Sequence, residues 1–394
     1  MHPKFFFLFV LLIAGTLHLS ACSPSSLHKR DLFLQPEAET LPENAGRLMQ
    51  HEVLSVRWRV KLMEVDARPV DQHHHGAPAV SQDGLRVFVG SYDGAFYAID
   101  SNTGKVLWRR LTKAKFAGSS LAADGLVFAG ATSGEMFAFR ESDGQIMWTH
   151  RSQAAVEGKP VLAGDRLLFM TNTNQIICLD AQTGEWRWSY KRDVPTGRFQ
   201  VQGVCDPLVH DDQVYVGFSD GFAARLNLQD GSVQAVRRLS KSGARFTDVD
   251  GSPLMVGDTV VMTEFSSGIL ALDPQSLEER WSHEVEGASR LVRNGDLLFY
   301  SSSQSNVEAL RVKDAELQWR FKAGKGSLSH PVLAGNWLLV SSGEHSLLVL
   351  DQATGKLLQI FNPGKGSGSP PAVVGQKVFW LSNGQVLYGM RLAG

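Results

Sequence analysis

The chain has 394 residues, with 39 lysines and arginines against 40 aspartates and glutamates, so its formal net charge at pH 7 is −1. A chain without a basic excess has no broad positive field that would attract a polyanion, which argues against nucleic acid as a partner.

The first residues have the features of a secretory signal. His2 and Lys4 flank the start of a run of thirteen apolar or small residues, 5–17. A membrane-spanning helix needs about 20 apolar residues, so this run is too short to span and is typical of a signal peptide. It leads into LSAC, residues 19–22, which resembles the bacterial lipobox, whose cysteine is lipidated on its sulfur and becomes the new N-terminus after cleavage.

We therefore predict that residues 1–21 are a lipoprotein signal peptide and that Cys22 carries the lipid. The alternative is an ordinary signal peptide with a cysteine there by chance. The residue after this cysteine is Ser23 and not the aspartate that is associated with retention in the inner membrane. This favours the periplasmic face of the outer membrane. Residues 22–50 mix proline, serine and charge without a sustained period, so we expect a tether.

The remaining residues, 51–394, are built by repetition. Three segments align without gaps, YDGAFYAIDSNTGKVLW, TSGEMFAFRESDGQIMW and NTNQIICLDAQTGEWRW. Each has a polar anchor, a glycine four positions on and a tryptophan eight positions on. The anchors along the chain are Asp100, Arg140, Asp180, Asn227, Asp273, Arg311 and Asp351. Leu277 and Ala315 replace the glycine, and Ala235 and Gln359 replace the tryptophan.

Each unit offers about four short β runs separated by turn signals. Gly94 suits a tight hairpin and Gly104 a wider one, because glycine tolerates the positive φ that such turns need. A tryptophan on the last strand would cover the apolar face of the neighbouring unit. Four-stranded sheets repeated every 38 to 47 residues predict a β-propeller.

The two ends of the repeat region complement each other. The eighth unit runs through NGQVLYGMR, residues 383–391, and lacks a tryptophan strand, whereas SVRWRV, residues 55–60, is a tryptophan strand without a unit before it. We predict an all-β, eight-bladed propeller of four-stranded antiparallel blades, closed by this N-terminal strand with Trp58 in the last blade.

Two junctions between blades are longer than the others, 189–207 and 237–253. Both follow the last strand of one blade and precede the first strand of the next, so they should lie on one face, where loops concentrate recognition residues. In RFTDVDGSP, Asp248 and Asp250 would point the same way from an extended segment, which favours a cationic partner group. Arg245 is either that group or a contact of its own. The alternative is that these carboxylates cap local turns.

The lipobox, the tether, the PQQ-like repeats and the phrase RFTDVDGSP together resemble the outer-membrane protein assembly factor BamB family. The resemblance implies a non-catalytic scaffold, without a cofactor, that binds the periplasmic POTRA domains of BamA and assists insertion of β-barrel proteins. It also implies that Asp248 and Asp250 form the acidic interface pair and that unfolded client proteins are possible partners. Arg198 and Phe199 are the nearest equivalents of a second contact cluster in the preceding junction.

The main rival class is a periplasmic quinoprotein, a PQQ-dependent dehydrogenase, because such enzymes carry the same repeat. They resemble one another in a calcium held by carboxylate and amide groups, a catalytic aspartate and often two adjacent cysteines. The sequence has no adjacent cysteines, so we expect no catalytic residue and no enzyme activity. Cys178 and Cys205 match no metal or redox motif; they either pair or are buried thiols.

His73, His74 and His75 suggest a metal site at first sight. Adjacent strand residues point to opposite faces, so two of the three at most could share an ion, and two ligands make a weak site. We expect no metal there. A structural propeller that bridges envelope components other than BamA stays open as a third class.

Overall fold

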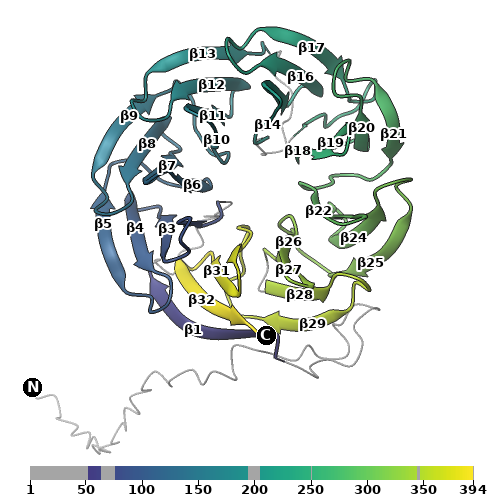
Figure 1. Cartoon of the computed structure of the whole chain (residues 1–394). Coiled ribbons are helices and arrows are strands. Elements are labelled where there is room, and N and C mark those ends of the chain that lie inside the picture. The colour runs from purple at the N-terminus through teal and green to yellow at the C-terminus, as the bar shows by residue number, and fades with distance from the viewer. Residues whose placement is uncertain (1–51, 64–75, 194–204, 250, 344–346, 394) are drawn as a thin grey trace, which may run out of the picture.

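The computed structural model describes residues 52–63, 76–193, 205–249, 251–343 and 347–393. Within these residues it contains 32 strands and no helix, and the strands form eight four-stranded antiparallel sheets around a central axis (Figure 1). None of the described segments is an apolar helix of the length that crosses a bilayer. The predicted eight-bladed propeller is thus confirmed.

Each blade is a meander whose first strand lies nearest the axis and whose last strand lies on the rim. Blades 1 to 4 consist of β2 (Ala79–Val80), β3 (Arg86–Gly90), β4 (Ala95–Asp100) and β5 (Val106–Leu111); β6 (Ser120–Ala123), β7 (Leu126–Gly130), β8 (Glu135–Arg140) and β9 (Ile146–Arg151); β10 (Val161–Ala163), β11 (Arg166–Met170), β12 (Gln175–Asp180) and β13 (Trp186–Lys191); and β14 (Leu208–His210), β15 (Gln213–Gly217), β16 (Phe222–Asn227) and β17 (Val233–Arg238).

Blades 5 to 8 continue in the same order. They consist of β18 (Gly251–Val256), β19 (Thr259–Glu264), β20 (Gly268–Leu272) and β21 (Glu279–His283); β22 (Val292–Asn294), β23 (Leu297–Ser301), β24 (Asn306–Arg311) and β25 (Leu317–Lys322); β26 (Val332–Ala334), β27 (Trp337–Ser341), β28 (Leu347–Asp351) and β29 (Leu357–Phe361); and β30 (Ala372–Val374), β31 (Lys377–Leu381) and β32 (Val386–Leu392) with β1 (Leu54–Lys61).

The two middle strands of a blade are mostly buried, whereas the outer strand is mostly exposed. In blade 2, every residue of β7 is buried, while β9 has mainly exposed side chains. Middle strands are covered on both faces by the neighbouring blades, so apolar residues fill most of their positions instead of alternating with polar ones. This packing divides the core into clusters that each join two adjacent blades.

The anchor aspartate of the repeat closes the last hairpin of its blade. Asp100 Oδ1 accepts hydrogen bonds from the backbone N–H groups of Asn102 and Thr103, at 3.0 and 2.8 Å. Gly104 follows with φ of +74°, as the sequence predicts. Where the glycine is missing, Leu277 adopts the same left-handed conformation, with φ of +59°.

The repeat tryptophans join neighbouring blades. Trp108 donates its indole N–H to the Glu141 carbonyl oxygen of the next blade at 2.9 Å. A Cβ on Gly144 would lie 2.5 Å from the Trp108 ring, so the glycine also makes room for it. Trp58, Trp148, Trp188 and Trp319 repeat this arrangement.

At one contact between neighbouring blades, a small residue replaces the repeat tryptophan and a large residue replaces the repeat glycine. At the joint between blades 4 and 5, Ala235 stands where other blades have tryptophan, and the buried Leu277 stands where they have glycine. The small residue on one blade leaves the space that the large one on the next blade fills. The volume at the joint is kept although both repeat residues have changed.

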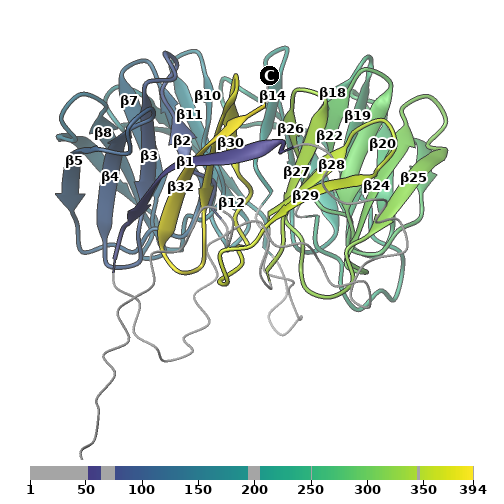
Figure 2. The ribbon, with the colours of Figure 1, turned by 90° about the horizontal axis from the view of Figure 1, so that it is seen from below.

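The first strand closes the ring. β1 pairs with β32 as the outermost strand of blade 8, and Figures 1 and 2 show the two side by side. Trp58 donates to the Ser101 carbonyl oxygen of blade 1 at 3.0 Å. The predicted closure by an N-terminal tryptophan strand is therefore confirmed.

Gln359 holds this strand from the other side. It occupies the tryptophan position of blade 7 and is 0% exposed. Its Oε1 accepts hydrogen bonds from the N–H groups of Val53 and Leu54, at 2.9 and 2.7 Å, and its Nε2 donates to the Leu54 carbonyl oxygen at 3.0 Å. A bulky indole there would leave these backbone groups without their partner.

Cys178 and Cys205 are buried thiols in one apolar cluster and form no disulfide. Burial raises the pKa of the Cys178 thiol to about 11. A thiol with so high a pKa is largely un-ionised at neutral pH, and it behaves as a small apolar side chain.

Candidate functional site

The two long junctions leave from the same face of the ring. One joins β13 to β14 and the other joins β17 to β18. Each connects the rim strand of one blade to the axial strand of the next. Because strands alternate in direction within a blade, both connections emerge on one face. Residues 194–204 and Asp250 lie outside the described residues, which include 192–193, 205–207 and 239–249 of the two junctions.

The turn between β15 and β16 fastens both junctions. Arg192, just after β13, donates from Nε to Asp220 Oδ2 at 2.5 Å, and its guanidinium carbon lies 3.8 Å from the centroid of the Phe222 ring. From the other junction, Thr247 Oγ1 donates to the Ser219 carbonyl oxygen at 3.1 Å. Asp220 and Ser219 are neighbours, so the two junctions meet at one turn.

The Arg192–Asp220 ion pair is largely buried. Its side chains are 20% and 7% exposed. Loss of one partner would leave the other charge buried without a counter-charge, so the pair is costly to break. It therefore fixes the place where the first junction leaves blade 3. Asn174 of blade 3 supports it, because its amide donates to Ser219 Oγ at 2.8 Å and accepts from the Ser219 N–H at 2.9 Å.

The second junction dips between blades 4 and 5 before it reaches β18. The Val249 N–H donates to the Phe218 carbonyl oxygen at 3.2 Å, and the Phe265 N–H donates to the Asp248 carbonyl oxygen at 3.0 Å. The Val249 side chain packs against Gly217, where a Cβ would collide with it. Residues 247–249 are therefore part of the core between the two blades.

The exposed part of this junction carries cations and an aromatic ring. We call Lys241, Arg245, Phe246 and Glu284 the junction patch. Lys241 Nζ lies 2.6 Å from Glu284 Oε1, and the Arg245 guanidinium carbon lies 5.4 Å from the centroid of the Phe246 ring. That ring meets Phe265 edge-on, with centroids 5.4 Å apart. The patch is thus anchored to blade 5 and presents charged groups to solvent.

The predicted contact residues differ in their exposure to solvent. Arg245 is exposed on the junction patch. Asp248 is 1% exposed, so its carboxylate lies beneath the surface, and its part in binding stays a prediction. Asp250, Arg198, Phe199, Cys22 and His73 to His75 lie outside the described residues.

Sequence reasoning missed the contacts that join the two junctions. The dipeptide Asp220-Gly221 indicates a turn, and Gly221 has φ of +85°. Nothing in the sequence pairs that turn with Arg192, which is 28 residues away on another blade. Among the described residues, no group of three or more histidine, cysteine, aspartate or glutamate side chains is arranged to hold a metal ion.

The chain is similar in sequence to BamB proteins. A family model described as outer membrane protein assembly factor BamB matches residues 55–132, 116–321 and 305–393. The BamB of Kangiella koreensis is 38% identical over 249 residues, which is 62% of this chain and 63% of that protein. The BamB of Alkalilimnicola ehrlichii is 27% identical over 141 residues, 34% of this chain and 37% of that protein. The chain thus spans less than two thirds of these curated relatives.

Solved structures share the fold. The crystal structure of BamB from Moraxella catarrhalis has a TM-score of 0.75 and 20% identity, covering 86% of this chain and 100% of that one. The quinohemoprotein alcohol dehydrogenase from Comamonas testosteroni has a TM-score of 0.69 and 12% identity, covering 86% of this chain and 77% of that one. At these identities the likeness concerns the fold alone.

Proposed function

This chain belongs to the outer membrane protein assembly factor BamB family, and from that premise we propose that it is a non-catalytic scaffold in the assembly of outer membrane proteins. The observation that carries the proposal is the meeting of two enlarged junctions at one turn on one face of the ring. A rigid disc with its variable loops gathered in this way suits the binding of another protein.

The partner we propose is the POTRA region of BamA, within the machinery that inserts β-barrel proteins. The junction patch supplies Arg245 and the half-buried Phe246, a pairing of cation and aromatic ring that is common in protein interfaces. Asp250, Arg198 and Phe199 are proposed as further contacts. Because Asp248 is buried, we assign it the role of holding the loop in place while its neighbours meet the partner.

The same proposal places the chain at the membrane. Residues 1–21 are the signal peptide, Cys22 carries the lipid, and residues 22–50 tether the propeller to the periplasmic face of the outer membrane. A tether of this kind keeps the propeller within reach of a membrane-embedded partner. A dehydrogenase shares the fold at 12% identity, which gives no support to a second, enzymatic function.

Binding to the soluble POTRA region tests the proposal. We expect the full chain to retain it in a pull-down and Arg245→Glu to weaken the association by at least about tenfold, because the exposed cation becomes an anion. Asp250→Arg should have a similar effect. Charge reversal at Asp248 is a poor test, since a buried arginine would disturb the joint between blades 4 and 5.

The matched control is Arg293→Glu. Arg293 lies in β22, an axial strand that starts at the junction face, and its Nε donates to the Gly295 carbonyl oxygen in the turn at the other end of the strand, at 2.9 Å. This exposed arginine therefore lies toward the opposite face. It should bind POTRA as the unchanged chain does. Equal binding by the Arg245→Glu, Asp250→Arg and Arg293→Glu chains, all with unchanged thermal unfolding, would contradict the proposed contact face. No retention of the unchanged chain would reject BamA as the partner.

A further inference from the structure

The axial strands begin at equivalent positions whose side chains surround one cavity. In each blade, the axial strand pairs with the second strand from an equivalent residue, such as Val161, Leu208, Val292 or Val332. The residue two positions before it lies at the entrance to the axis. Around the ring these are Ala77, Ser119, Lys159, Asp206, Ser252, Arg290, His330 and Pro370. The entrance lies on the junction face, because each junction ends there.

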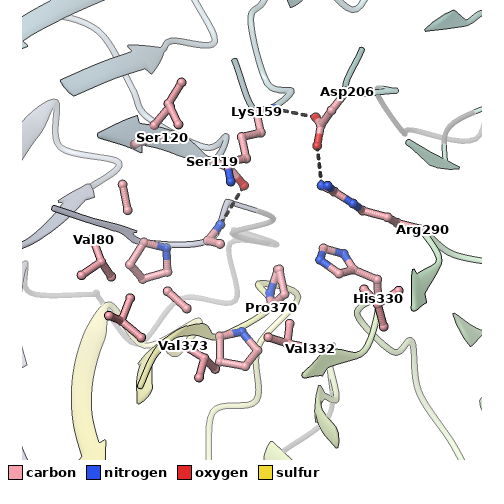
Figure 3. A pocket seen from close by; sticks show the side chains of 18 of the residues that line it. Val80, Ser119, Ser120, Lys159, Asp206, Arg290, His330, Val332, Pro370 and Val373 are labelled. Carbon is pink, nitrogen blue, oxygen red and sulfur yellow. Dashed lines mark hydrogen bonds and ion pairs between the residues drawn. The ribbon is translucent and has the colours of Figure 1, made fainter. Parts of the chain in front are cut away.

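The cavity has a volume of about 470 Å³ and an uneven lining. Figure 3 shows Lys159, Asp206, Arg290 and His330 on one side, while Val80, Val373 and Pro370 form the other side. One wall of the cavity is therefore ionisable and the opposite wall is apolar.

Asp206 is already engaged by the structure. Its Oδ1 accepts a hydrogen bond from the Lys159 backbone N–H at 2.7 Å, and its Oδ2 lies 2.8 Å from Arg290 Nη1. The bond from the Lys159 N–H has an equivalent between blades 1 and 2, where Ser119 Oγ accepts from the Ala77 N–H at 2.9 Å. A carboxylate that holds two blades together has little capacity left to balance a second cation.

The Lys159 ammonium is that second cation. Among the described residues, neither a hydrogen bond nor an ion pair involves its Nζ. Lys159 lines the cavity and is partly exposed there, yet partial burial and the nearby charge of Arg290 lower its pKa. Burial, followed by the charges of Arg290 and Lys159, also lowers the pKa of His330 to about 3, so this imidazole is neutral at pH 7.

The ionisable wall holds two basic side chains, Lys159 and Arg290, against the single carboxyl group of Asp206. Arg290 has further N–H donors beyond the one that meets Asp206, and His330 can donate one N–H. An anion in the cavity would offset the excess charge, and the apolar wall would cover a hydrocarbon portion. Neither the excess of basic side chains nor the apolar wall takes part in the proposed binding of POTRA domains.

We propose that this axial cavity binds a small organic anion through a carboxylate or phosphate group, held by Lys159 Nζ and the Arg290 guanidinium. His330 supplies a neutral donor, and the hydrocarbon portion lies against Val80, Val373 and Pro370. The axis of the propeller is then a ligand site beside the face that carries the junction patch.

Calorimetric titration of the full chain tests the site with phenyl phosphate, benzoate and inorganic phosphate, in chloride buffer of constant ionic strength. We expect saturable one-site binding of phenyl phosphate or benzoate, and whichever binds more tightly identifies the head group. Inorganic phosphate should bind at least about tenfold more weakly than phenyl phosphate, because it has no portion for the apolar wall.

Lys159→Met should weaken binding of the preferred probe by at least about tenfold, and Lys159→Arg should restore much of it. Lys313→Met is the matched control, since this exposed lysine lies in the β24–β25 turn on the opposite face. If Lys159→Met impairs folding, Lys159→Gln serves in its place. The proposal is overturned if no probe binds saturably, or if the folded Lys159 variants bind like the unchanged chain.

Discussion

At the scale of single residues, Asp180 shows how one repeat position performs two tasks. Its Oδ1 accepts from the N–H groups of Gln182 and Thr183, each at 2.9 Å, which closes the hairpin. Its Oδ2 lies 2.6 Å from Arg187, on the outer strand of the same blade. The bonds to Arg187 and to the turn lower the pKa of Asp180 to about 2.

This lowered pKa predicts a pH-dependent contribution to stability. A carboxylate whose pKa is lower in the folded chain stabilises it above the unfolded pKa, and the contribution disappears as the pH falls through the folded pKa. Asp180→Asn should therefore lower the urea midpoint at pH 6, and the difference from the unchanged chain should shrink between about pH 4 and about pH 2.

Arg187→Gln provides the control for that prediction. In this background Asp180→Asn should have a smaller effect at pH 6, because the ionic partner is gone while the turn can keep its hydrogen bonds to an amide oxygen. A difference between the unchanged chain and the Asp180→Asn variant that stays constant from pH 6 to pH 2 would contradict the assigned role of the ion pair.

Asp248 marks the limit of prediction at this scale. The spacing of the repeat anchors marks the second junction as longer than most others, but alternation within that segment gives no information on which side faces the core. That choice depends on Gly217, which leaves room for Val249, and on Phe218 and Phe265, whose backbones bind the segment. These residues come from two different blades, so a local pattern could not predict the burial of Asp248.

At the scale of elements, the joint between blades 4 and 5 shows that exceptions to a repeat occur in pairs. Ala235 and Leu277 depart from tryptophan and glycine together, and both belong to the apolar cluster of that joint. The sequence displays both departures. Their connection becomes visible only when the rim strand of blade 4 is placed against the last hairpin of blade 5.

A double-mutant cycle should detect this connection. Ala235→Trp alone should destabilise the chain by about 1–3 kcal/mol through overpacking. Leu277→Gly alone leaves a cavity, which typically costs about 2–5 kcal/mol, offset by about 1 kcal/mol from relief of the left-handed leucine. The double variant rebuilds the arrangement of the other joints, so its loss should be at least about 1 kcal/mol smaller than the sum.

Urea unfolding at equilibrium measures all four chains of the cycle. Losses that add to within about 0.5 kcal/mol would mean that the two residues act independently. Ala181→Gly is a suitable reference for a small change beside an intact tryptophan joint, because Trp148 bonds the carbonyl oxygen of Ala181.

Much of the element level is predictable because the repeat is regular. The anchor aspartates, their glycines and the tryptophans locate the last hairpin of most blades, and the structure confirms Gly94 and Gly104 as left-handed residues. The contacts of Arg192 are of another kind. They join segments that no repeat position links, so the repeat pattern predicts where the junction lies but not its geometry.

At the scale of the whole molecule, the ring depends on a polar clasp at its seam. Gln359 satisfies three backbone groups of Val53 and Leu54, and the Ala393 N–H adds a bond of 2.7 Å to the Val53 carbonyl oxygen. The repeat would place tryptophan at position 359. The seam departs from the repeat because no hairpin follows it, so there is no glycine surface for an indole to cover.

Gln359→Ala should therefore destabilise the chain by about 3 kcal/mol or more, because three buried backbone groups lose their partner. Urea unfolding gives the value, and hydrogen exchange should show faster opening of β1 than of β9. Gln182→Ala, at an exposed glutamine, should change stability by less than about 0.5 kcal/mol.

A second variant distinguishes the clasp from simple loss of volume. Gln359→Trp restores the repeat residue and adds apolar area, yet we expect it to destabilise the chain as well, since indole cannot replace the amide. A Gln359→Trp variant as stable as the unchanged chain would show that filling the seam matters more than its hydrogen bonds.

The pairing of β1 with β32 also constrains the order of events in making the protein. During synthesis, the strand that seals the disc emerges before any blade, and its partner emerges last. Trp58 cannot take its final place until about 330 further residues have been made, and loop closure over that distance is slow. The newly made chain thus passes through a stage with an open gap and an exposed indole, when chaperones and proteases have their best access to it.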